Sequence, residues 1–537
     1  MKRNIFIVIA LFISVYSFGQ GEIDAYRMSK NDLSGTARGQ AMGGAFGALG
    51  GDATGIAINP AGIGIYRSSE ILLNLGLNYN RTNAFFNGTN ETTGKTTFSC
   101  NNFGYVGTFP LDNKNSDYSI NFGFNYNRLK DFTSKYRVSG TGMRASLTDY
   151  MADITNLSVP KVAQSWWPNT PGEAFQANNP PHWLSILGWY SYLIDPISNK
   201  PNETVYTSRK AIPDDGFGIL YPGETVAPNL VVNESGSIDA YDFTLGANLN
   251  NKVYVGGTIV YTDISYDATV YYDESFENGG SGFKLTNGYS TQGSGIQLKV
   301  GVIGRPTDAL RLGLSYQSPT WYNLTDFYNG TLDPYGITDN DVPILTPRGN
   351  GYDSYRYNFR TPDIWTFSAA CVLGQDAVIS VDYEYKDYGK MKFSPQYIND
   401  YNYSNENQWI KEDFKGTSTV RVGAEYRFSP QFSGRLGTAW VQQPYDSQFK
   451  NGEVQVMTPG TISNYTIDGN SLYLTGGVGF RFTPQFYMDL ALVYRTQKAD
   501  LYFFSPTFDG VNRVVDSTPA KMTNDSFNTL LTLGYRF

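Results

Sequence analysis

Apolar and polar residues alternate along many stretches of about ten residues. In residues 73–80 every odd position is apolar or aromatic, and every even position is polar or glycine. The same alternation recurs over residues 118–127, 241–249, 310–316 and 486–494. Because successive side chains of a strand face opposite sides of a sheet, each stretch has one apolar and one polar face. The pattern therefore predicts a protein made mainly of β-strands.

Short and long connections take turns between these strands. Tight turns are expected at residues 110–116, 250–251, 305–308, 374–375, 429–431 and 483–485. Long polar connections are expected near residues 84–94, 131–236, 273–282, 322–360, 391–414, 443–469 and 501–524. This arrangement is typical of outer-membrane barrels, whose strands are antiparallel. We therefore predict an all-β, antiparallel transmembrane β-barrel of about 14 strands over residues 70–537, with 131–236 as its largest external loop.

The composition agrees with a membrane barrel and excludes other classes. The chain has 56 Gly, 41 Tyr and 33 Phe, and only 17% of its residues are charged. Soluble domains carry about 25% charged residues. The net charge of −8 gives no basic surface for nucleic acid, so no nucleic-acid partner is expected.

Both ends of the sequence point to export. Lys2 and Arg3 precede an apolar run from Ile5 to Phe18, which predicts a signal peptide over residues 1–19, cut ahead of Gln20. The last residues alternate and finish on Phe537, which resembles the signal read by the barrel-assembly machinery. We expect the protein in the cell outer membrane, in contact with outer-membrane lipids. The predicted topology places both termini in the periplasm.

Residues 20–69 do not read as strands. Residues 37–52 are rich in Gly and Ala, and Asp52-Ala-Thr-Gly55 and Asn59-Pro60-Ala61 follow before the first strand. About fifty such residues are too few for an independent core. We expect them to fold inside the barrel as an N-terminal hatch.

The same motifs resemble a known family. The Gly-Gln-Ala-Met-Gly-Gly-Ala stretch (residues 39–45), Asp52-Ala-Thr-Gly55 and Asn59-Pro60-Ala61 look like the hatch of FadL/TodX-like transporters of hydrophobic compounds, in a Bacteroidetes-type member. Residues 305–318, 361–365 and 421–428 also resemble this family, although the 131–236 loop is longer than expected for it. The resemblance assigns Gly55, Asn59, Pro60 and Ala61 to the hatch motif.

The resemblance also implies a mechanism. It suggests a monomeric 14-stranded barrel that is blocked by its hatch. Long-chain fatty acids or hydrocarbons would be captured outside and held in a pocket of the barrel. They would then leave through a side opening in the wall, without ATP or a soluble cofactor.

Charged residues on the inward faces of the strands are candidate anchors. An apolar molecule with a carboxylate needs a cation inside the barrel, and Arg binds carboxylates bidentately. Arg421 and Arg435 are the preferred candidates, followed by Lys299 and Arg311. The alternative is a network of Arg–carboxylate pairs that holds the wall and the hatch together. The other inward charges are Arg427, Arg481, Arg495, Asp382, Glu384, Glu425 and Asp489.

The 131–236 connection is rich in aromatic residues. An exposed apolar patch there would be a first landing site for a hydrophobic substrate. The alternative is that these side chains pack the loop against itself or lie in an interfacial girdle. The candidate capture residues are Trp166, Trp167, Trp183, Trp189 and Tyr190.

Histidine and cysteine usage narrows the remaining functions. His182 is the only histidine, so neither a His-cluster metal site nor histidine-based catalysis is expected, and the chain is not expected to be an enzyme. Cys100 and Cys371 are expected to be small strand residues rather than a disulfide. Two other functions stay open: a barrel like the type IX secretion shuttles, which bind cargo proteins, and a haemin receptor with His182 as ligand.

Overall fold

The structure is a computed structural model that describes residues 20–111, 117–208, 225–276, 280–338, 341–346, 354–397, 401–509 and 512–537. The expected signal peptide, residues 1–19, lies outside the described residues. Part of the 131–236 connection, residues 209–224, also lies outside them.

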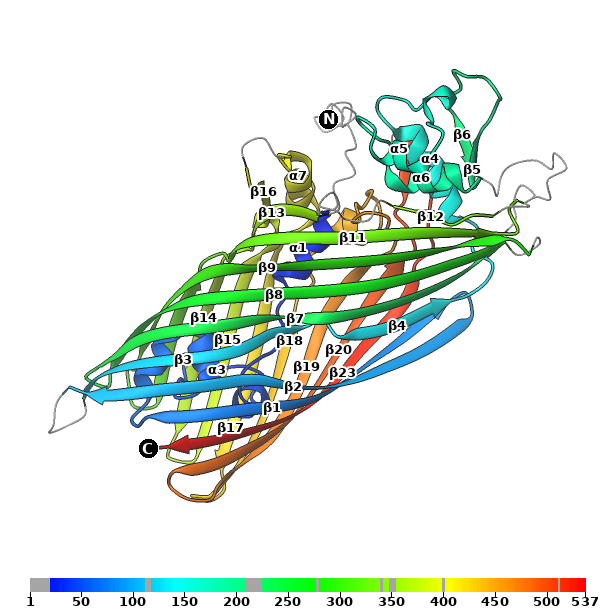
Figure 1. Cartoon of the computed structure of the whole chain (residues 1–537). Helices are drawn as coiled ribbons and strands as arrows, with labels where there is room; N and C mark the ends of the chain where they lie inside the picture. Colours follow the sequence, from blue (N-terminus) through cyan, green and yellow to red (C-terminus); the bar gives the residue numbers. More distant parts are fainter. Residues whose placement is uncertain are drawn as a thin grey trace, which may run out of the picture.

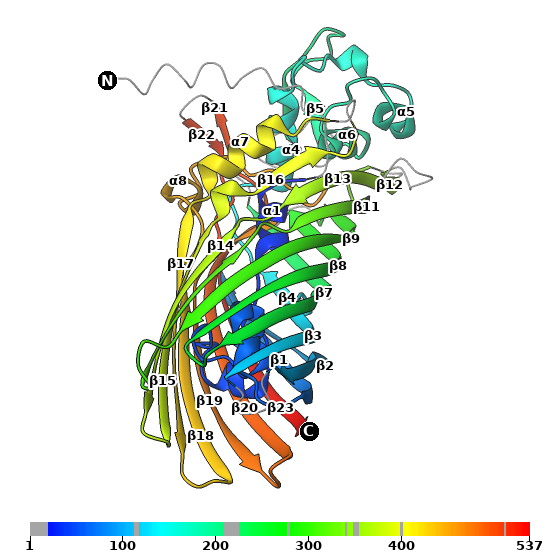
Figure 2. The ribbon, with the colours of Figure 1, turned by 90° about the vertical axis from the view of Figure 1, so that its left-hand side faces the viewer.

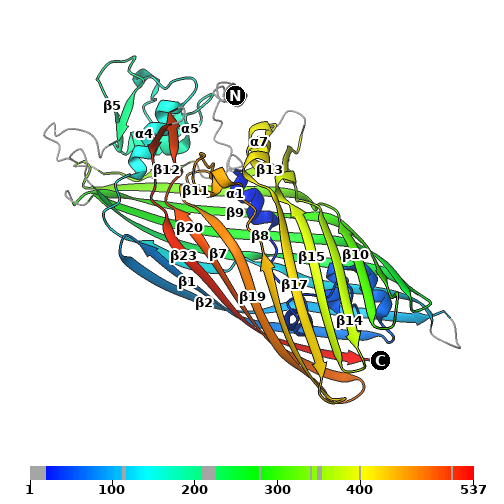
Figure 3. The ribbon, with the colours of Figure 1, turned by 180° about the vertical axis from the view of Figure 1, so that it is seen from behind.

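The wall is a closed barrel of 14 antiparallel strands (Figures 1 and 3). Strand β1 pairs with both β2 and β23, which closes the ring and leaves no open edge. The continuous strands are β1 (Glu70–Phe86), β2 (Thr89–Pro110), β7 (Val226–Leu249), β8 (Val253–Phe276), β9 (Gly282–Gly304), β17 (Gly416–Arg427), β18 (Phe432–Val441), β19 (Tyr465–Arg481), β20 (Phe486–Tyr502) and β23 (Ala520–Arg536). The predicted fold class and strand number are confirmed.

The other strands of the wall are each interrupted once. They are β3 (Tyr118–Asp131) with β4 (Ser134–Ser139), β10 (Leu310–Gln317) with β11 (Trp321–Tyr335), β13 (Ser354–Arg360) with β14 (Ile364–Leu373), and β15 (Ala377–Asp387) with β16 (Lys392–Pro395). Proline marks two of the breaks, at Pro319 and Pro362. Proline has no backbone N–H to donate to the ladder, so the pairing is interrupted there.

The outer face of the wall carries an apolar band. Leu245, Ile259 and Leu298 point outward and are about half exposed or more. One edge of the band is marked by aromatic residues such as Tyr241 and Tyr261, and the other by Phe428 and Phe482. An apolar band between aromatic girdles is the lipid-facing surface of a membrane barrel.

Several strands continue beyond this band, into segments predicted as loops. β4 reaches Ser139 and β7 begins at Val226, so both ends of the predicted 131–236 loop are strand. The ladder between β7 and β8 runs unbroken from Val226–Phe276 to Leu249–Val253. The outward side chains turn polar there, as at Asn233 and Ser235, which removed the alternation used for the prediction. The loop boundary is therefore corrected.

Small helices and strands cover the end of the barrel with the long connections. The largest connection contains α4 (Leu147–Leu157), η2 (Gln164–Trp166), α5 (Pro171–Phe175), α6 (Trp183–Tyr190), β5 (Ile194–Pro196) and β6 (Tyr206–Ser208). Others contain β12 (Ile344–Leu345), η4 (Tyr388–Lys390), α7 (Ser404–Asp413), α8 (Ser447–Lys450), β21 (Thr507–Asp509) and β22 (Asn512–Val515). Within the described parts of the chain, no helix is long and apolar enough to cross a membrane.

Residues 20–69 run along the inside of the barrel (Figure 2). They form α1 (Glu22–Ser29), α2 (Ala37–Ala41), α3 (Ala53–Ile58) and η1 (Pro60–Ile65). Gln20 donates to Asp326 beside the long connections, whereas Phe537 donates to Ser69 at the short-turn end. The first and last described residues therefore lie toward opposite ends of the barrel. The side of the membrane that each faces stays a prediction.

Candidate functional site

Glycines of the inner wall let the N-terminal segment approach the strands closely. A Cβ atom on Gly437 would lie 2.2 Å from the amide nitrogen of Gly43, and one on Gly423 would lie 2.3 Å from the carbonyl oxygen of Met42. Neither distance is compatible with a side chain. The same kind of backbone contact occurs at Gly256, Gly301 and Gly313. The high glycine content thus includes a set of seats for residues 41–60.

The predicted hatch motif lies together at the base of this segment. The Asn59 side chain donates to the carbonyl oxygens of Gly47 (2.8 Å) and Val302 (3.3 Å), and accepts from the backbone N–H of Ala61 (3.1 Å). Pro60 is the first residue of η1, and a Cβ on Gly55 would lie 3.2 Å from Cα of Gly50. One asparagine therefore joins the segment to β9 and caps η1.

The two preferred cations are engaged in ion pairs. Arg435 lies between Glu425 (Nε–Oε2 2.6 Å) and Asp489 (Nη1–Oδ1 2.5 Å). Arg38 of the N-terminal segment also contacts Glu425, at 2.9 Å. Arg421 pairs with Glu384 at 2.8 Å, although its Nη1 finds no partner among the described residues. These contacts are those of the network interpretation, in which wall and segment are held by Arg–carboxylate pairs.

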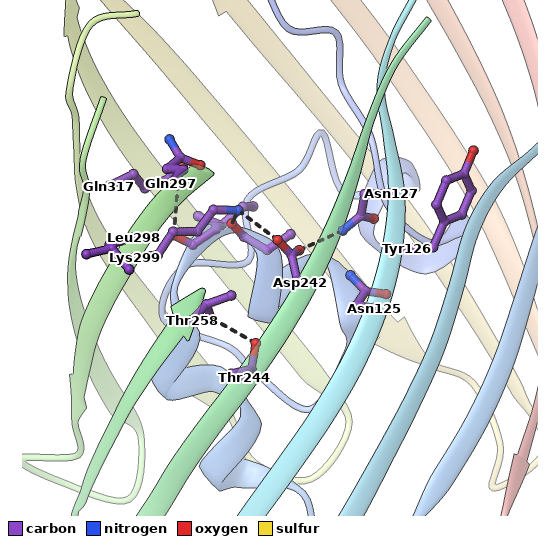
Figure 4. Close-up of polar contacts among 12 residues, drawn as sticks. Asn125, Tyr126, Asn127, Asp242, Thr244, Thr258, Gln297, Leu298, Lys299 and Gln317 are labelled. Carbon is purple, nitrogen blue, oxygen red and sulfur yellow. Dashed lines mark hydrogen bonds and ion pairs between the residues drawn. The ribbon is translucent and has the colours of Figure 1, made fainter. Parts of the chain in front are cut away.

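The other two predicted cations bind the N-terminal segment. Lys299 donates to the carbonyl oxygen of Ala57 (3.2 Å) and to Asp242 (3.4 Å), which also accepts from Asn127 (Figure 4). Arg311 donates to the carbonyl oxygen of Leu49 at 2.8 Å. Whether any of the four predicted cations binds a substrate stays a prediction.

A cavity of about 280 Å³ lies between α1 and the wall. Its lining comes from residues 23–40 and from β1, β2, β3, β7, β8, β19, β20 and β23, with the 458–464 connection above. The lining includes the basic residues Arg27, Lys30, Arg81, Arg128, Lys130 and Arg495, and the acidic residues Asp32, Asp131, Glu234, Asp468 and Asp525. It is thus a mixed polar and apolar site, not the closed apolar cavity that a pure hydrocarbon channel would predict.

Arg495 stands apart from the other cations that line the cavity. Lys30 pairs with Asp468 at 2.5 Å, Lys130 with Asp32 at 2.8 Å and Arg128 with Asp239 at 3.0 Å. Arg495, in contrast, donates only to the neutral side chains of Ser471 and Gln497. Among the described residues, no carboxylate is within ion-pair distance of Arg495, and its buried Nε has no hydrogen-bond partner.

The surroundings of Arg495 combine aromatic and aliphatic groups. Its guanidinium lies 6.0 Å from the centre of the Tyr473 ring. Leu33, Leu129 and Met522 line the same cavity. A ligand with an anionic head and an apolar body would find partners for both of its parts here.

Sequence alternation found Arg495 as an inward charge but did not single it out. The alternation gives the face on which a side chain lies, and Arg421 and Arg435 share that face. Which cation has a carboxylate beside it depends on the residues of neighbouring strands and of the N-terminal segment. Arg27, Lys30 and Asp32 were missed because the segment has no strand pattern to read.

The aromatic residues of the largest connection pack mainly on one another. Trp167 and Trp189 stack at 4.9 Å, and the Trp167 Nε1–H donates to the Tyr206 hydroxyl at 2.9 Å. Trp183 is buried and its ring lies 5.0 Å from Tyr328 of β11. Trp166, Trp189 and Tyr190 stay partly exposed. The self-packing interpretation is therefore confirmed, and capture of a substrate by this loop stays a prediction.

His182 and the cysteines are structural. The His182 Nδ1 accepts from the backbone N–H of Leu184 (3.2 Å) at the start of α6, and burial lowers the pKa of the imidazole to about 4. Cys100 and Cys371 are both free thiols. The described residues contain no group of His, Cys, Asp and Glu side chains that could hold a metal ion.

Comparisons with known proteins bear on the fold. A FadL homologue from Pseudomonas aeruginosa superposes with a TM-score of 0.50 at 12% identity, over 94% of this chain and 99% of that chain. The Pseudomonas putida toluene transporter TodX gives 0.46 at 12% identity, over 94% and 99%. The monoaromatic hydrocarbon channel CymD gives 0.43 at 13% identity, over 94% and 98%.

Sequence comparison adds nothing to this picture. No protein-family model matches the chain, and no curated protein matches it by sequence. The fold can still be stated, because the superposition on the FadL homologue spans almost the whole of both chains. This protein is a closed 14-stranded barrel with the FadL-like fold.

Proposed function

We propose that this protein is a passive outer-membrane channel for hydrophobic molecules that carry an acidic head, such as long-chain fatty acids. One observation carries the proposal: a cavity inside the barrel holds a guanidinium without an ion-pair partner, next to aliphatic and aromatic side chains. A buried cation is costly unless it is paired, so an anionic ligand would supply the missing partner.

The binding mode follows from the lining. The carboxylate would be held by Arg495, with Ser471 and Gln497 as polar neighbours. The alkyl chain would lie against Leu33, Leu129 and Met522. This assignment favours fatty acids over hydrocarbons, because a hydrocarbon leaves the guanidinium unpaired.

Residues 20–69 would act as the hatch. They contact strands on several sides of the barrel and are largely buried. Such a segment would exclude polar solutes and leave the cavity as a binding site rather than an open pore. Because the barrel is passive, no ATP and no soluble cofactor would be needed.

The exit would be a seam between β2 and β3–β4. The ladder between β2 and β3 ends at Asn102–Asn127, so residues 89–101 of β2 pair only with β1. Side chains bridge the seam instead, as from Thr93 to the carbonyl oxygen of Lys135 (2.8 Å) and from Asn80 to that of Thr133 (2.9 Å). Ser99, Asn101 and Arg128 line the cavity on this side. Fewer backbone hydrogen bonds make this the weakest line in the wall.

Binding to the full-length barrel in detergent tests the proposal. Palmitate and its neutral analogue hexadecanol are titrated against the wild type, R495Q and R435Q, with native mass spectrometry as readout. We expect R495Q to weaken palmitate binding by roughly tenfold or more, the size of a lost charge-assisted hydrogen bond, and to leave hexadecanol unchanged. R435Q is expected to lower thermal stability but to keep palmitate binding.

Equal palmitate binding by wild type and R495Q would overturn the anchor. No binding of palmitate to any barrel would overturn the proposed substrate class. The haemin-receptor function gains no support, because His182 is buried and its Nδ1 is engaged. A monomeric state, capture by the external tryptophans and handling by the barrel-assembly machinery stay predictions.

A further inference from the structure

A groove of about 620 Å³ lies on the outer face of the wall, away from the cavity. It is lined by two successive rungs of the sheet across β8, β9, β11, β13 and β16, strands that follow one another around the wall (Figure 2). The register pairs Tyr261 with Ile296, Ile296 with Trp321, Trp321 with Arg360, and Arg360 with Lys392. One rung thus changes from apolar to cationic along its length.

The rung lies at the edge of the apolar band. On one side of it, Ile259 and Leu298 face outward and are exposed. On the other side the next rung is polar, with Ser294, Asn323 and Asn358. Tyr261 and Trp321 are 45% and 49% exposed, as expected for aromatic residues at a membrane–water interface.

The two cations of this rung have no anionic partner. Arg360 donates only to the carbonyl oxygen of Lys390, at 3.4 Å, and both Arg360 and Lys392 are exposed. Within the described parts of the chain, neither forms an ion pair. The nearby Asp363 is already paired with Lys390 (3.2 Å), and Asp263 lies at the far, β8 end of the second rung. Arg356, also exposed on β13, adds positive charge to the same face.

We propose that this groove binds the phosphate of a lipid headgroup in the leaflet next to the long connections. Arg360 and Lys392 would hold the phosphate, and the lipid chains would descend over Trp321 and Ile296 onto the apolar band. Cationic side chains beside exposed apolar residues at this depth match the phosphate and chains of an anionic lipid. The proposal does not depend on transport, because it concerns the outside of the wall.

Lipid retention by the purified full-length barrel tests the groove. Phosphatidylglycerol and diacylglycerol with the same acyl chains are added in detergent, and bound lipid is counted by native mass spectrometry. We expect R360Q/K392Q to bind phosphatidylglycerol roughly tenfold more weakly than the wild type, with no change for diacylglycerol. The control K135Q/K498Q removes two exposed cations from β4 and β20 and is expected to behave as wild type.

Further arms separate the alternatives. Millimolar glycerol 3-phosphate should not displace the lipid, because it lacks the chains; displacement would show a plain phosphate site and overturn the lipid assignment. R360K should retain most of the binding, which distinguishes lost charge from misfolding. R495Q should leave retention unchanged, so the two proposals fail separately. Equal binding by wild type and R360Q/K392Q would overturn the groove.

Discussion

At the scale of single residues, one carboxyl group connects the N-terminal segment to the external helices. Glu22 of α1 is 1% exposed, and its Oε1 accepts from the backbone N–H of Met457 at 3.1 Å. Its Oε2 has no partner among the described residues. Burial, and then the nearby Asp413 of α7, raise the pKa of Glu22 to about 8. Glu22 is therefore protonated in the folded protein at neutral pH.

This raised pKa predicts that docking of α1 weakens as the pH rises. An unfolded glutamate ionises near pH 4.5, whereas the folded Glu22 keeps its proton up to about pH 8. The unfolded state thus binds fewer protons between these values, and stability falls with pH across this window. Hydrogen exchange of α1, corrected for the intrinsic rate, should show less protection at pH 8.5 than at pH 6. E22Q should remove most of this dependence; an unchanged dependence would contradict the assignment.

At the scale of elements, the seating of residues 37–65 depends on the absence of side chains in the wall. Gly437 of β18 and its neighbour Gly476 of β19 make a matched pair. A Cβ on Gly437 would meet the backbone of Met42 and Gly43 at 2.2–2.3 Å, whereas one on Gly476 has no heavy atom closer than 3.4 Å. The two positions differ in what lies beside them, not in the type of strand.

G437A is therefore expected to displace the turn after α2, at a cost of about 1–3 kcal/mol, which is typical of overpacking. Alanine suits a strand better than glycine does, so the barrel itself should not be weakened. The measurement is hydrogen exchange of residues 37–45, together with the thermal midpoint. G476A is the control and should change neither. Equal protection of residues 37–45 in G437A and wild type would show that the contact is unimportant.

At the scale of the whole molecule, the wall closes without the N-terminal segment. β1 pairs with β23 from Glu70 to Phe85, and every strand of the ring is hydrogen-bonded to its neighbours. The segment contributes lumen contacts, such as Arg38 to Glu425 and Asn59 to Gly47 and Val302, but no rung of the ladder. The barrel and its filling are thus separable.

Removal of residues 20–66 is expected to leave a folded barrel that conducts polar solutes. The buried ion pairs left behind, such as Arg435 with Asp489, would be solvated by water in the opened lumen. Liposome swelling with a pentose should rise about tenfold or more over wild type, while the protein keeps its heat-dependent migration in gels. A barrel that stays impermeable would show that the external connections close it, and would contradict the hatch.

Much of this architecture follows from the sequence alone. Alternation at residues 73–80, 118–127 and 486–494 determines which side chains face lipid, because the period of a strand is two. The short turns and long connections determine the strand number and the antiparallel order. The motif around Asn59 locates the segment that fills the lumen. All of these are local signals, so they survive without knowledge of neighbours.

Only the tertiary structure decided which charges are available. Arg421, Arg435 and Arg495 are equivalent in the pattern, but carboxylates from adjacent strands pair the first two and leave the third without one. The same holds on the outer face, where register across five strands brings Arg360 and Lys392 beside Trp321. Pairing, register and the path of residues 20–69 join positions hundreds of residues apart. A sequence pattern of period two carries no information about them.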